Sequence, residues 1–346
     1  MSGSEPKAPP EAAAKPGRVV RPSRRPPSKL VLQAEAKDAG ASLAPFVSER
    51  GGITLADAEA AITRGGAYVN GVRIRQPGQQ LQAKDRIEVQ LRERGEVPEE
   101  PEALEKTRLL YLDAEVILVD KPAGVLAQEG RAGGADLTAL VNELLEERRE
   151  RRQAFLVHRL DRGTTGVCAL ARTRAAQAWM LGAFKQGKVR KEYLALCLDT
   201  RPGAAGAAPP PDSLDIDLAL GPDLTSPGRR KPDPLGEPAH TRAKVEKRWT
   251  LGKGGSTAAL IEAYPETGRT HQVRVHLSAR GLPLLGDGRY GGPAQLTSPS
   301  GARLELLRPM LHARRLQLER PKGGAVAASA PQPADFTAAL AFLNRG

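Results

Sequence analysis

Strand-like apolar runs dominate the chain between residues 107 and 265, and they do not alternate regularly with helices. The clearest runs are RLLYLDAEVILVDKPAG, TTGVCALA, VRKEYLALCL and STAALIEAYP, whereas helical periodicity is plain only at 136–152 and 173–188. A doubly wound fold requires a regular strand–helix alternation. The order of these patterns therefore predicts an α+β fold with a mixed or antiparallel sheet.

Length and charge narrow the class of protein further. A chain of 346 residues has room for about two domains, and its net charge of +12 favours polyanionic partners, nucleic acid first among them. An arginine-biased genome is the alternative explanation for this charge. Aromatic residues make up only 3% of the chain, which argues against a platform of stacked aromatic rings.

Several familiar chemistries lack their motifs. The chain contains no GxxxxGK[ST] loop, no GxGxxG after a strand, no HExxH pair and no GxSxG elbow. Cys168 and Cys197 lie inside apolar runs and predict neither a disulfide framework nor a zinc site. No apolar stretch approaches 18 residues, and the N-terminus lacks the apolar segment of a secretory signal. We therefore expect a cytoplasmic protein without membrane, metal or cofactor.

The first third of the chain predicts a tail, a small module and a linker. Residues 1–28 are rich in Pro, Ala and Arg and predict a disordered basic tail. Residues 40–91 contain two short helical patterns and an Asn70-Gly71 turn between strand-like runs, the sequence typical of a hairpin. This module resembles the alpha-L (S-four-type) RNA-binding domain, with a generic hairpin module as the alternative. Residues 92–106 are acidic and predict a linker.

Two polar blocks interrupt the apolar strands of the second domain. In FLVHRLDRGTTGVCALA, Asp161 lies close to two arginines, which would hold its carboxylate ionised as a nucleophile or base. A structural salt bridge in a turn is the alternative. The second block, PETGRTHQVRVHLSARG, has a cationic polar side, and its periodicity fits a strand or a helix equally. Tyr193 lies among apolar residues in KEYLAL, which by itself predicts a tyrosine in the hydrophobic core.

These blocks together carry a resemblance to a known family. VDKPAGVLAQ, HRLDRGTTG, KEYLAL, GRTHQVRVHL, GDGRYGG and LHARRL occur in the order found in the RluA family of pseudouridine synthases. Three departures are visible, namely Thr165 for the usual Ser, Val273 for the common Ile, and Glu319-Arg320-Pro321 where a His-Pro ending is frequent. The resemblance implies a catalytic domain over 107–322, followed by a C-terminal tail with a short helix at 323–346.

The resemblance also implies roles for individual residues. Asp161 would be the catalytic aspartate, Tyr193 the ring that packs on the target uracil and a candidate acceptor of its proton, and Arg269 the ion-pair partner of Asp161. Arg159 would enter the RNA stack in place of the target base. The remaining polar residues of the two blocks are expected to contact RNA or the base: His158, Thr164, Thr165, His271, Gln272 and Arg274.

The expected function is the isomerisation of uridine to pseudouridine in RNA. This reaction moves the uracil from its nitrogen to its carbon 5 on the same ribose, so it needs no redox or group-transfer cofactor. We expect a monomer that acts on ribosomal RNA, with transfer RNA as the other candidate substrate. A noncatalytic RNA-binding or ribosome-assembly factor is the alternative. An RNA methyltransferase is disfavoured because the methyl-donor fingerprint is missing.

Overall fold

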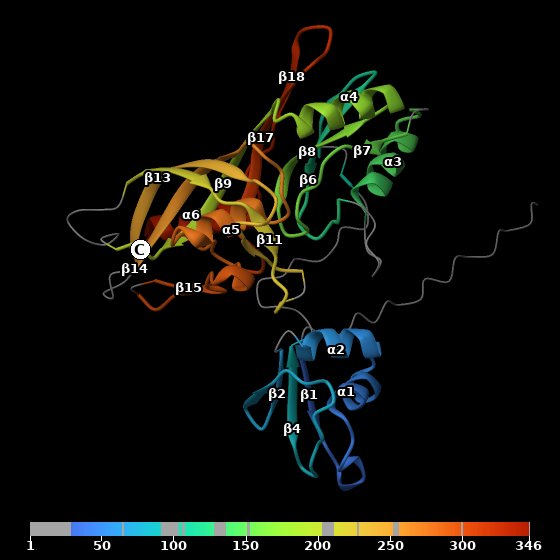
Figure 1. Cartoon of the computed structure of the whole chain (residues 1–346), viewed down its shortest axis with the longest axis vertical. Helices are drawn as coiled ribbons and strands as arrows, with labels where there is room; N and C mark the ends of the chain where they lie inside the picture. Colours follow the sequence, from blue (N-terminus) through green and yellow to red (C-terminus); the bar gives the residue numbers. More distant parts are fainter. Residues whose placement is uncertain are drawn as a thin grey trace, which may run out of the picture. The chain divides into compact units, whose positions relative to one another are not determined.

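The computed structural model describes two compact units of the chain (Figure 1). The described residues are 29–63, 66–90, 104–105, 108–127, 136–150, 153–202, 211–226, 228–251, 256–298 and 300–345. The first unit comprises the described residues up to 90 apart from Gly66, and the second comprises Gly66 and those from 104 onward. The expected basic tail at 1–28 and nearly all of the expected linker lie outside the described residues.

The first unit pairs two helices with a four-stranded antiparallel sheet of order β1-β4-β2-β3. Its elements are β1 (Lys29–Gln33), the 3-10 helix η1 (Ala36–Asp38), α1 (Leu43–Gly51), α2 (Leu55–Thr63), β2 (Ala67–Val69), β3 (Val72–Ile74) and β4 (Arg86–Gln90). The helices bury Leu43, Val47 and Ile62 against Ile87 and Val89 of the sheet.

The Asn70-Gly71 turn forms the predicted hairpin between β2 and β3. Both residues have positive φ, 51° and 81°, as a tight hairpin turn requires. The Asn70 amide also donates to Asp85 and accepts from the Arg86 amide, at 2.7 and 2.9 Å. The predicted start at residue 40 was too late, because β1 pairs with β4 and buries Leu30 in the same core. The identification of this unit as an alpha-L domain stays a prediction.

The second unit is built on a ten-stranded mixed sheet, which confirms the predicted fold class. The sheet order is β10-β13-β14-β9-β17-β8-β6-β5, with β18 beside β17 and β7 beside β8, and only the β17–β8 pair is parallel. The strands of this sheet are β5 (Leu109–Leu112), β6 (Val116–Lys121), β7 (Phe155–Leu156), β8 (Thr165–Ala171), β9 (Val189–Asp199), β10 (Ser213–Asp217), β13 (His240–Leu251), β14 (Ser256–Pro265), β17 (Leu311–Glu319) and β18 (Ala325–Ser329).

Two short hairpins and five helical segments accompany this sheet among the described residues. The hairpins pair β11 (Leu220–Pro222) with β12 (Arg230–Pro232) and β15 (Gln295–Thr297) with β16 (Arg303–Glu305). The helical segments are α3 (Leu137–Glu147), α4 (Arg174–Lys185), α5 (Gln272–Ala279), the 3-10 helix η3 (Gly288–Tyr290) and α6 (Ala334–Arg345). In the described part of the chain no helix has the length and apolar character needed to cross a membrane.

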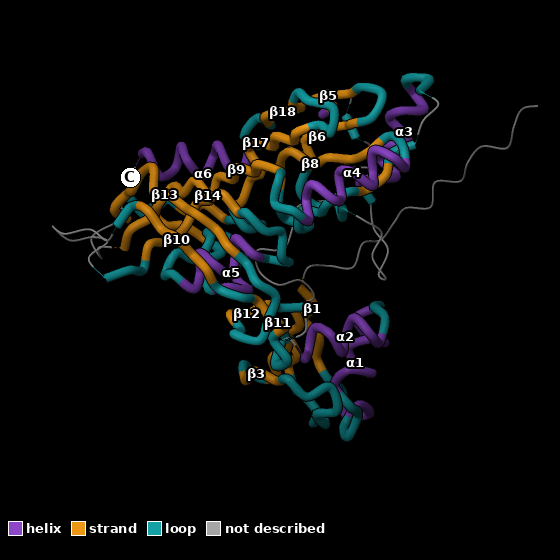
Figure 2. The backbone as a smooth tube through the Cα atoms, turned by 45° about the horizontal axis from the view of Figure 1, so that its top comes forward, coloured by secondary structure: helices purple, strands orange, loops and turns teal. Residues whose placement is uncertain are grey.

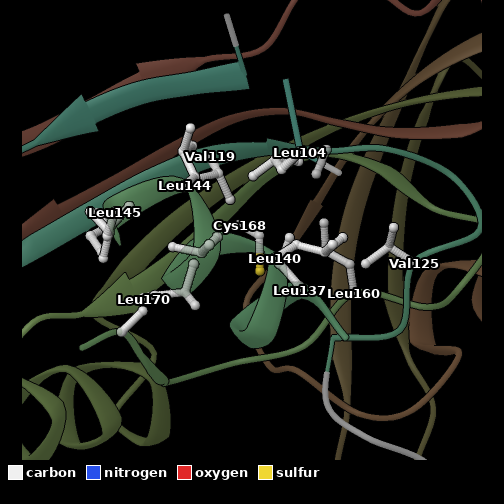
Figure 3. Close-up of a cluster of buried hydrophobic side chains, with 14 residues drawn as sticks. Leu104, Val119, Val125, Leu137, Leu140, Leu144, Leu145, Leu160, Cys168 and Leu170 are labelled. Atoms are coloured by element: carbon white, nitrogen blue, oxygen red, sulfur yellow. The ribbon is translucent and has the colours of Figure 1, made fainter. Parts of the chain in front are cut away.

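Alternate residues of β6 and β8 are buried in two separate hydrophobic cores, because successive side chains of a strand point to opposite faces of the sheet. Ile117 and Cys168 pack with the apolar stripe of α3, the cluster shown in Figure 3. Leu118 and Ala169 belong instead to the core on the α4 side. Burial on both faces explains why these strands read as continuous apolar runs.

Helices α5 and α6 cover opposite faces of β9, β13 and β14 (Figure 2). The α6 residues Phe336, Ala339 and Leu343 are buried in the core on their face. Strand β18 extends the sheet at β17. Residues 325–345 therefore pack as part of the folded unit and do not form a tail, whereas the short helix predicted in this segment is present as α6. The Ala-rich sequence of α6 conceals its apolar stripe.

Candidate active site

Asp161 lies in the turn that leads into the central strand β8. Its carbonyl accepts a hydrogen bond from the Thr164 amide at 3.0 Å, which closes the turn. The side chain is 20% exposed, so the carboxylate is largely enclosed but still accessible. This placement at the end of a central strand meets the requirement for a reactive carboxylate beside a rigid scaffold.

Gly166 sets the start of β8 against its parallel neighbour β17. Its φ is +109°, and an added Cβ would lie 2.2 Å from the carbonyl oxygen of Ala313. The neighbouring Thr165 is paired with His312, and its hydroxyl lies 2.9 Å from His312 Nδ1. The last glycine of the HRLDRGTTG block is thus required by close backbone approach, and it fixes where the Asp161 turn ends and β8 begins.

The guanidinium partner of Asp161 is Arg274. Its Nη1 donates to Asp161 Oδ2 at 3.2 Å, while its Nε and Nη2 bind the two oxygens of Asp287 at 2.7 and 2.8 Å. Asp287 is 1% exposed. A planar guanidinium held by a buried carboxylate cannot swing away, so Arg274 presents its third edge to Asp161 in a fixed direction.

The prediction that Arg269 forms an ion pair with Asp161 is wrong. Arg269 donates instead to the Glu237 carboxylate at 2.9 Å and to the Pro238 carbonyl at 3.0 Å. The second polar block forms helix α5 from Gln272, so Arg269 belongs to the preceding turn and Arg274 to the first turn of the helix. The periodicity of this segment fits a strand or a helix equally, and the formation of a helix decides which arginine faces Asp161.

The electrostatic surroundings keep Asp161 ionised. Burial alone would raise the pKa of its carboxyl, but the charges of protonated His271 and of Arg274, together with the Arg274 hydrogen bond, lower it below the usual value. Burial in turn lowers the pKa of His271 to about 4, so this imidazole is neutral near pH 7. Arg274 is therefore the group that holds the carboxylate charge at neutral pH.

His271 stands at the N-terminal end of α5 with a left-handed backbone. Its φ is 58°, its Nε2 lies 3.9 Å from Asp161 Oδ1, and its Nδ1 lies 2.8 Å from the hydroxyl of Tyr290. A non-glycine residue in this region carries backbone strain and persists where its surroundings hold it. The strained residue is thus held between Asp161 and a buried tyrosine.

Tyr193 lies in β9, which pairs with β17 on one side and β14 on the other. Its ring packs against the apolar clusters under α3 and α5 while remaining partly exposed. Burial, followed by the negative charge of Asp161, raises the pKa of its phenol. The hydroxyl therefore stays protonated at neutral pH, close to the carboxylate.

Four residues expected to contact RNA make their contacts within the fold, three of them buried and His158 half-buried. His158 accepts from the Ala169 amide at 2.9 Å and stacks on Phe184, and burial lowers its pKa to about 3. Gln272 makes four side-chain hydrogen bonds, to Thr267, Arg269, His240 and Thr241. Thr164 and Thr165 are 2% and 3% exposed. Arg159, in contrast, is exposed next to the Asp161 turn.

Sequence reasoning missed four residues that support the site: Asp287, Tyr290, Lys121 and Arg308. Lys121 is fully buried and donates to the carbonyls of Pro122, Val125 and Arg162. Arg308, also fully buried, donates to the Gly163 carbonyl at 3.1 Å and forms two hydrogen bonds with Asp335 of α6. The first three lie inside recognised blocks, but charged residues such as Asp287, Lys121 and Arg308 are expected on surfaces, and nothing local in the sequence marks them as buried.

Comparison with known proteins places the chain in a family. Residues 115–279 match the family model for RNA pseudouridylate synthase. A protein of Haemophilus ducreyi named ribosomal large subunit pseudouridine synthase D is 31% identical over 285 residues, 80% of this chain and 82% of that one. The protein of the same name from Vibrio cholerae is 34% identical over 301 residues, 82% and 87% of the two chains.

A solved structure agrees with the fold. The human RNA pseudouridylate synthase domain containing 4 superposes with a TM-score of 0.50 at 24% identity, over 69% of this chain and 93% of that one. The α+β architecture with a mixed sheet is thus shared with a pseudouridylate synthase domain. With the family match and relatives more than 30% identical over four fifths of the chain, the chain belongs to the RNA pseudouridylate synthase family and isomerises uridine in RNA to pseudouridine.

Proposed function

We propose that the chain modifies ribosomal RNA of the large subunit, with Asp161 as the catalytic group. The observation that carries the catalytic assignment is the ion pair of Asp161 with Arg274, itself fixed by the buried Asp287. The relatives from Haemophilus ducreyi and Vibrio cholerae, both named for the large ribosomal subunit, support the substrate.

The reaction requires an ionised carboxylate beside the ribose. The bond between carbon 1′ and uracil N1 breaks, the uracil turns, carbon 5 bonds to carbon 1′, the proton on carbon 5 leaves and N1 gains one. Asp161 serves this sequence by attacking carbon 1′ or by removing a ribose proton. Either role needs a charged oxygen held in direction, and Arg274 supplies both the charge balance and the orientation.

Tyr193 and Arg159 are assigned the two tasks created by base flipping. Extruding a uridine costs a few kcal/mol and leaves a gap in the RNA stack. Tyr193 presents a partly exposed ring close to Asp161 and packs on the flipped uracil. Its raised pKa favours this packing role over the acceptance of a proton. Arg159 is exposed two residues before Asp161 and fills the gap left in the stack.

The catalytic assignment is tested by Asp161→Asn, which keeps the size of the side chain and removes its charge. Tritium release from RNA labelled at carbon 5 of uridine should be abolished, with RNA affinity nearly unchanged. Substantial release by this variant would overturn the assignment.

A matched pair of arginine variants tests the ion pair. Arg274→Lys should lower kcat by about 10- to 100-fold, because an ammonium cannot bind Asp287 with two bonds and reach Asp161 as well. Arg269→Lys, on the same segment, should change kcat by no more than about twofold because the Arg269 side chain binds the surface Glu237 and the Pro238 carbonyl, away from Asp161. Equal losses would contradict the assigned partner.

The substrate is tested by mapping pseudouridine in ribosomal and transfer RNA of the source cells with and without the gene. The proposal expects the loss of modified sites in large-subunit ribosomal RNA. Loss confined to transfer RNA would refute the proposed substrate while leaving the isomerase activity in place.

A further inference from the structure

Tyr290 connects three of the elements around the site. It is 4% exposed and belongs to the GDGRYGG block, outside the residues that sequence reasoning assigned. Its hydroxyl oxygen lies 2.9 Å from the Arg230 amide of β12 and 2.8 Å from His271 Nδ1. The guanidinium of Arg274 lies over its ring, 5.0 Å from the centroid. Tyr290 thus contacts both groups that face Asp161.

These hydrogen bonds favour one of the two neutral tautomers of His271. The backbone amide of Arg230 can only donate, so the Tyr290 oxygen accepts from it. The single hydroxyl hydrogen of Tyr290 is then free to donate to His271 Nδ1. An Nδ1 atom that accepts has no proton, and a neutral imidazole carries its one proton on Nε2 instead.

The geometry on the other side of the imidazole leads to the same tautomer. His271 Nε2 lies 3.9 Å from Asp161 Oδ1, whereas Arg274 contacts the other carboxylate oxygen, Oδ2. An N–H facing a carboxylate is attracted to it, whereas a nitrogen lone pair in that place would repel it. The two oxygens of Asp161 therefore face two different donors, one cationic and one neutral.

The backbone of His271 also fixes the direction of the imidazole. Its left-handed conformation places it at the N-terminal end of α5, where its carbonyl already accepts from the Val275 amide. A strained backbone of this kind persists only when the contacts of the residue determine it. The hydroxyl of Tyr290 is one of these contacts, so its removal would release the ring as well as its tautomer.

We propose that Tyr290 is a positioning residue that holds His271 in the Nε2–H tautomer, so that His271 restrains Asp161 Oδ1 and leaves the carboxylate aligned for reaction. The distance of 3.9 Å exceeds that of a formed hydrogen bond, and the contact tightens when substrate brings the carboxylate and imidazole together. This inference rests on the proposed catalytic role of Asp161.

The tautomer is measured directly on the full chain labelled with ¹⁵N-histidine, by two-bond ¹H–¹⁵N correlation at pH 7. The chain has only five histidines, and His271→Gln identifies the signals of His271. The expected result is an Nε2–H imidazole in the native protein and a shift toward Nδ1–H or a mixture in Tyr290→Phe. An Nδ1–H imidazole in the native protein would overturn the proposal.

Kinetics then separate positioning from a structural role. Tyr290→Phe keeps the ring beneath Arg274 and should lower kcat about tenfold with KM changed less than about twofold. Tyr111→Phe is the control, because its hydroxyl donates to Asp113 outside the site, and it should leave both constants unchanged. An unchanged kcat in Tyr290→Phe would refute the positioning role.

A double-variant cycle completes the test. In His271→Gln the side-chain amide offers a donor whose protonation does not depend on Tyr290, so adding Tyr290→Phe should cost little further kcat. An equal loss in both backgrounds would show that Tyr290 does not act through His271. The tautomer is read without turnover, so an active Asp161→Asn would refute the catalytic assignment independently of the NMR result.

Discussion

Replacement of Gly166 by alanine tests whether close approach of β8 to β17 determines the position of the catalytic turn. The new Cβ would lie 2.2 Å from the Ala313 carbonyl oxygen and 2.8 Å from its amide nitrogen. Both are backbone atoms of a paired strand, so relief requires β8 and β17 to separate. Alanine would also have to adopt a φ near +109°, which is strained for any residue with a Cβ.

Gly323→Ala is the matched control for this change. Gly323 has a φ of +90°, but an added Cβ there meets no atom within 4 Å. The control should therefore cost only the backbone strain, about 1–2 kcal/mol of unfolding free energy. Gly166→Ala should cost about 1–3 kcal/mol more, the usual penalty of overpacking. At about 2–4 °C per kcal/mol, its Tm should fall roughly 2–12 °C below that of the control.

The assay combines calorimetry of the full chain with tritium release from RNA labelled at carbon 5 of uridine. Gly166→Ala should also lower kcat, because Asp161 lies in the turn that enters β8, whereas Gly323→Ala should not. If the two variants lost the same stability, the close approach would contribute nothing. If Gly166→Ala kept full activity despite a lower Tm, strand register would not position Asp161.

Three further predictions address the C-terminal helix, pH and the first unit. Asp335→Asn should cost about 1–3 kcal/mol of unfolding free energy, because it removes the charge of the only carboxylate that binds the fully buried Arg308 among the described residues. The cost stays in this range because the Asp335 side chain is 43% exposed. An unchanged Tm would contradict this prediction. Burial would raise the pKa of Asp113, but hydrogen bonds from two backbone amides and from the side chains of Tyr111 and Arg320 lower it to about 2. The ionised Asp113 therefore stabilises the fold above about pH 4, and this stabilisation is lost as the pH falls toward 2. The Tm advantage of the native chain over Asp113→Asn should shrink across this interval, and a constant difference would refute the pKa assignment. Removing residues 1–91 should weaken RNA binding and flatten its salt dependence, measured by filter binding over a salt series, because basic contacts are lost; equal slopes would argue against RNA contacts in this part.

Local patterns determined the elements of the fold. Continuous apolar runs predicted several strands of the second unit, among them β6, β8, β9 and β14, and the stripe at 137–145 predicted α3. Asn70-Gly71 specified its hairpin turn because both residues tolerate positive φ. Each of these features depends on neighbours within a few residues, which a sequence displays directly.

Partners across the sheet were decided only by tertiary structure. Asp161 and Arg274 are 113 residues apart, and Thr165 and His312 are 147 apart. Arg269 and Arg274 are equally basic in sequence, and only the start of α5 at Gln272 turns the second of them toward the aspartate. Helix formation and strand pairing choose between chemically equivalent side chains.

Burial of charge was likewise decided by the fold. Lys121 and Arg308 are fully enclosed because carbonyls and, for Arg308, the carboxylate of Asp335 satisfy their donors. A sequence shows that a residue is charged but does not show which distant acceptors will surround it. The ionised aspartate could thus be expected from its arginine-rich block, whereas the arginine that holds it depends on contacts between residues more than a hundred positions apart.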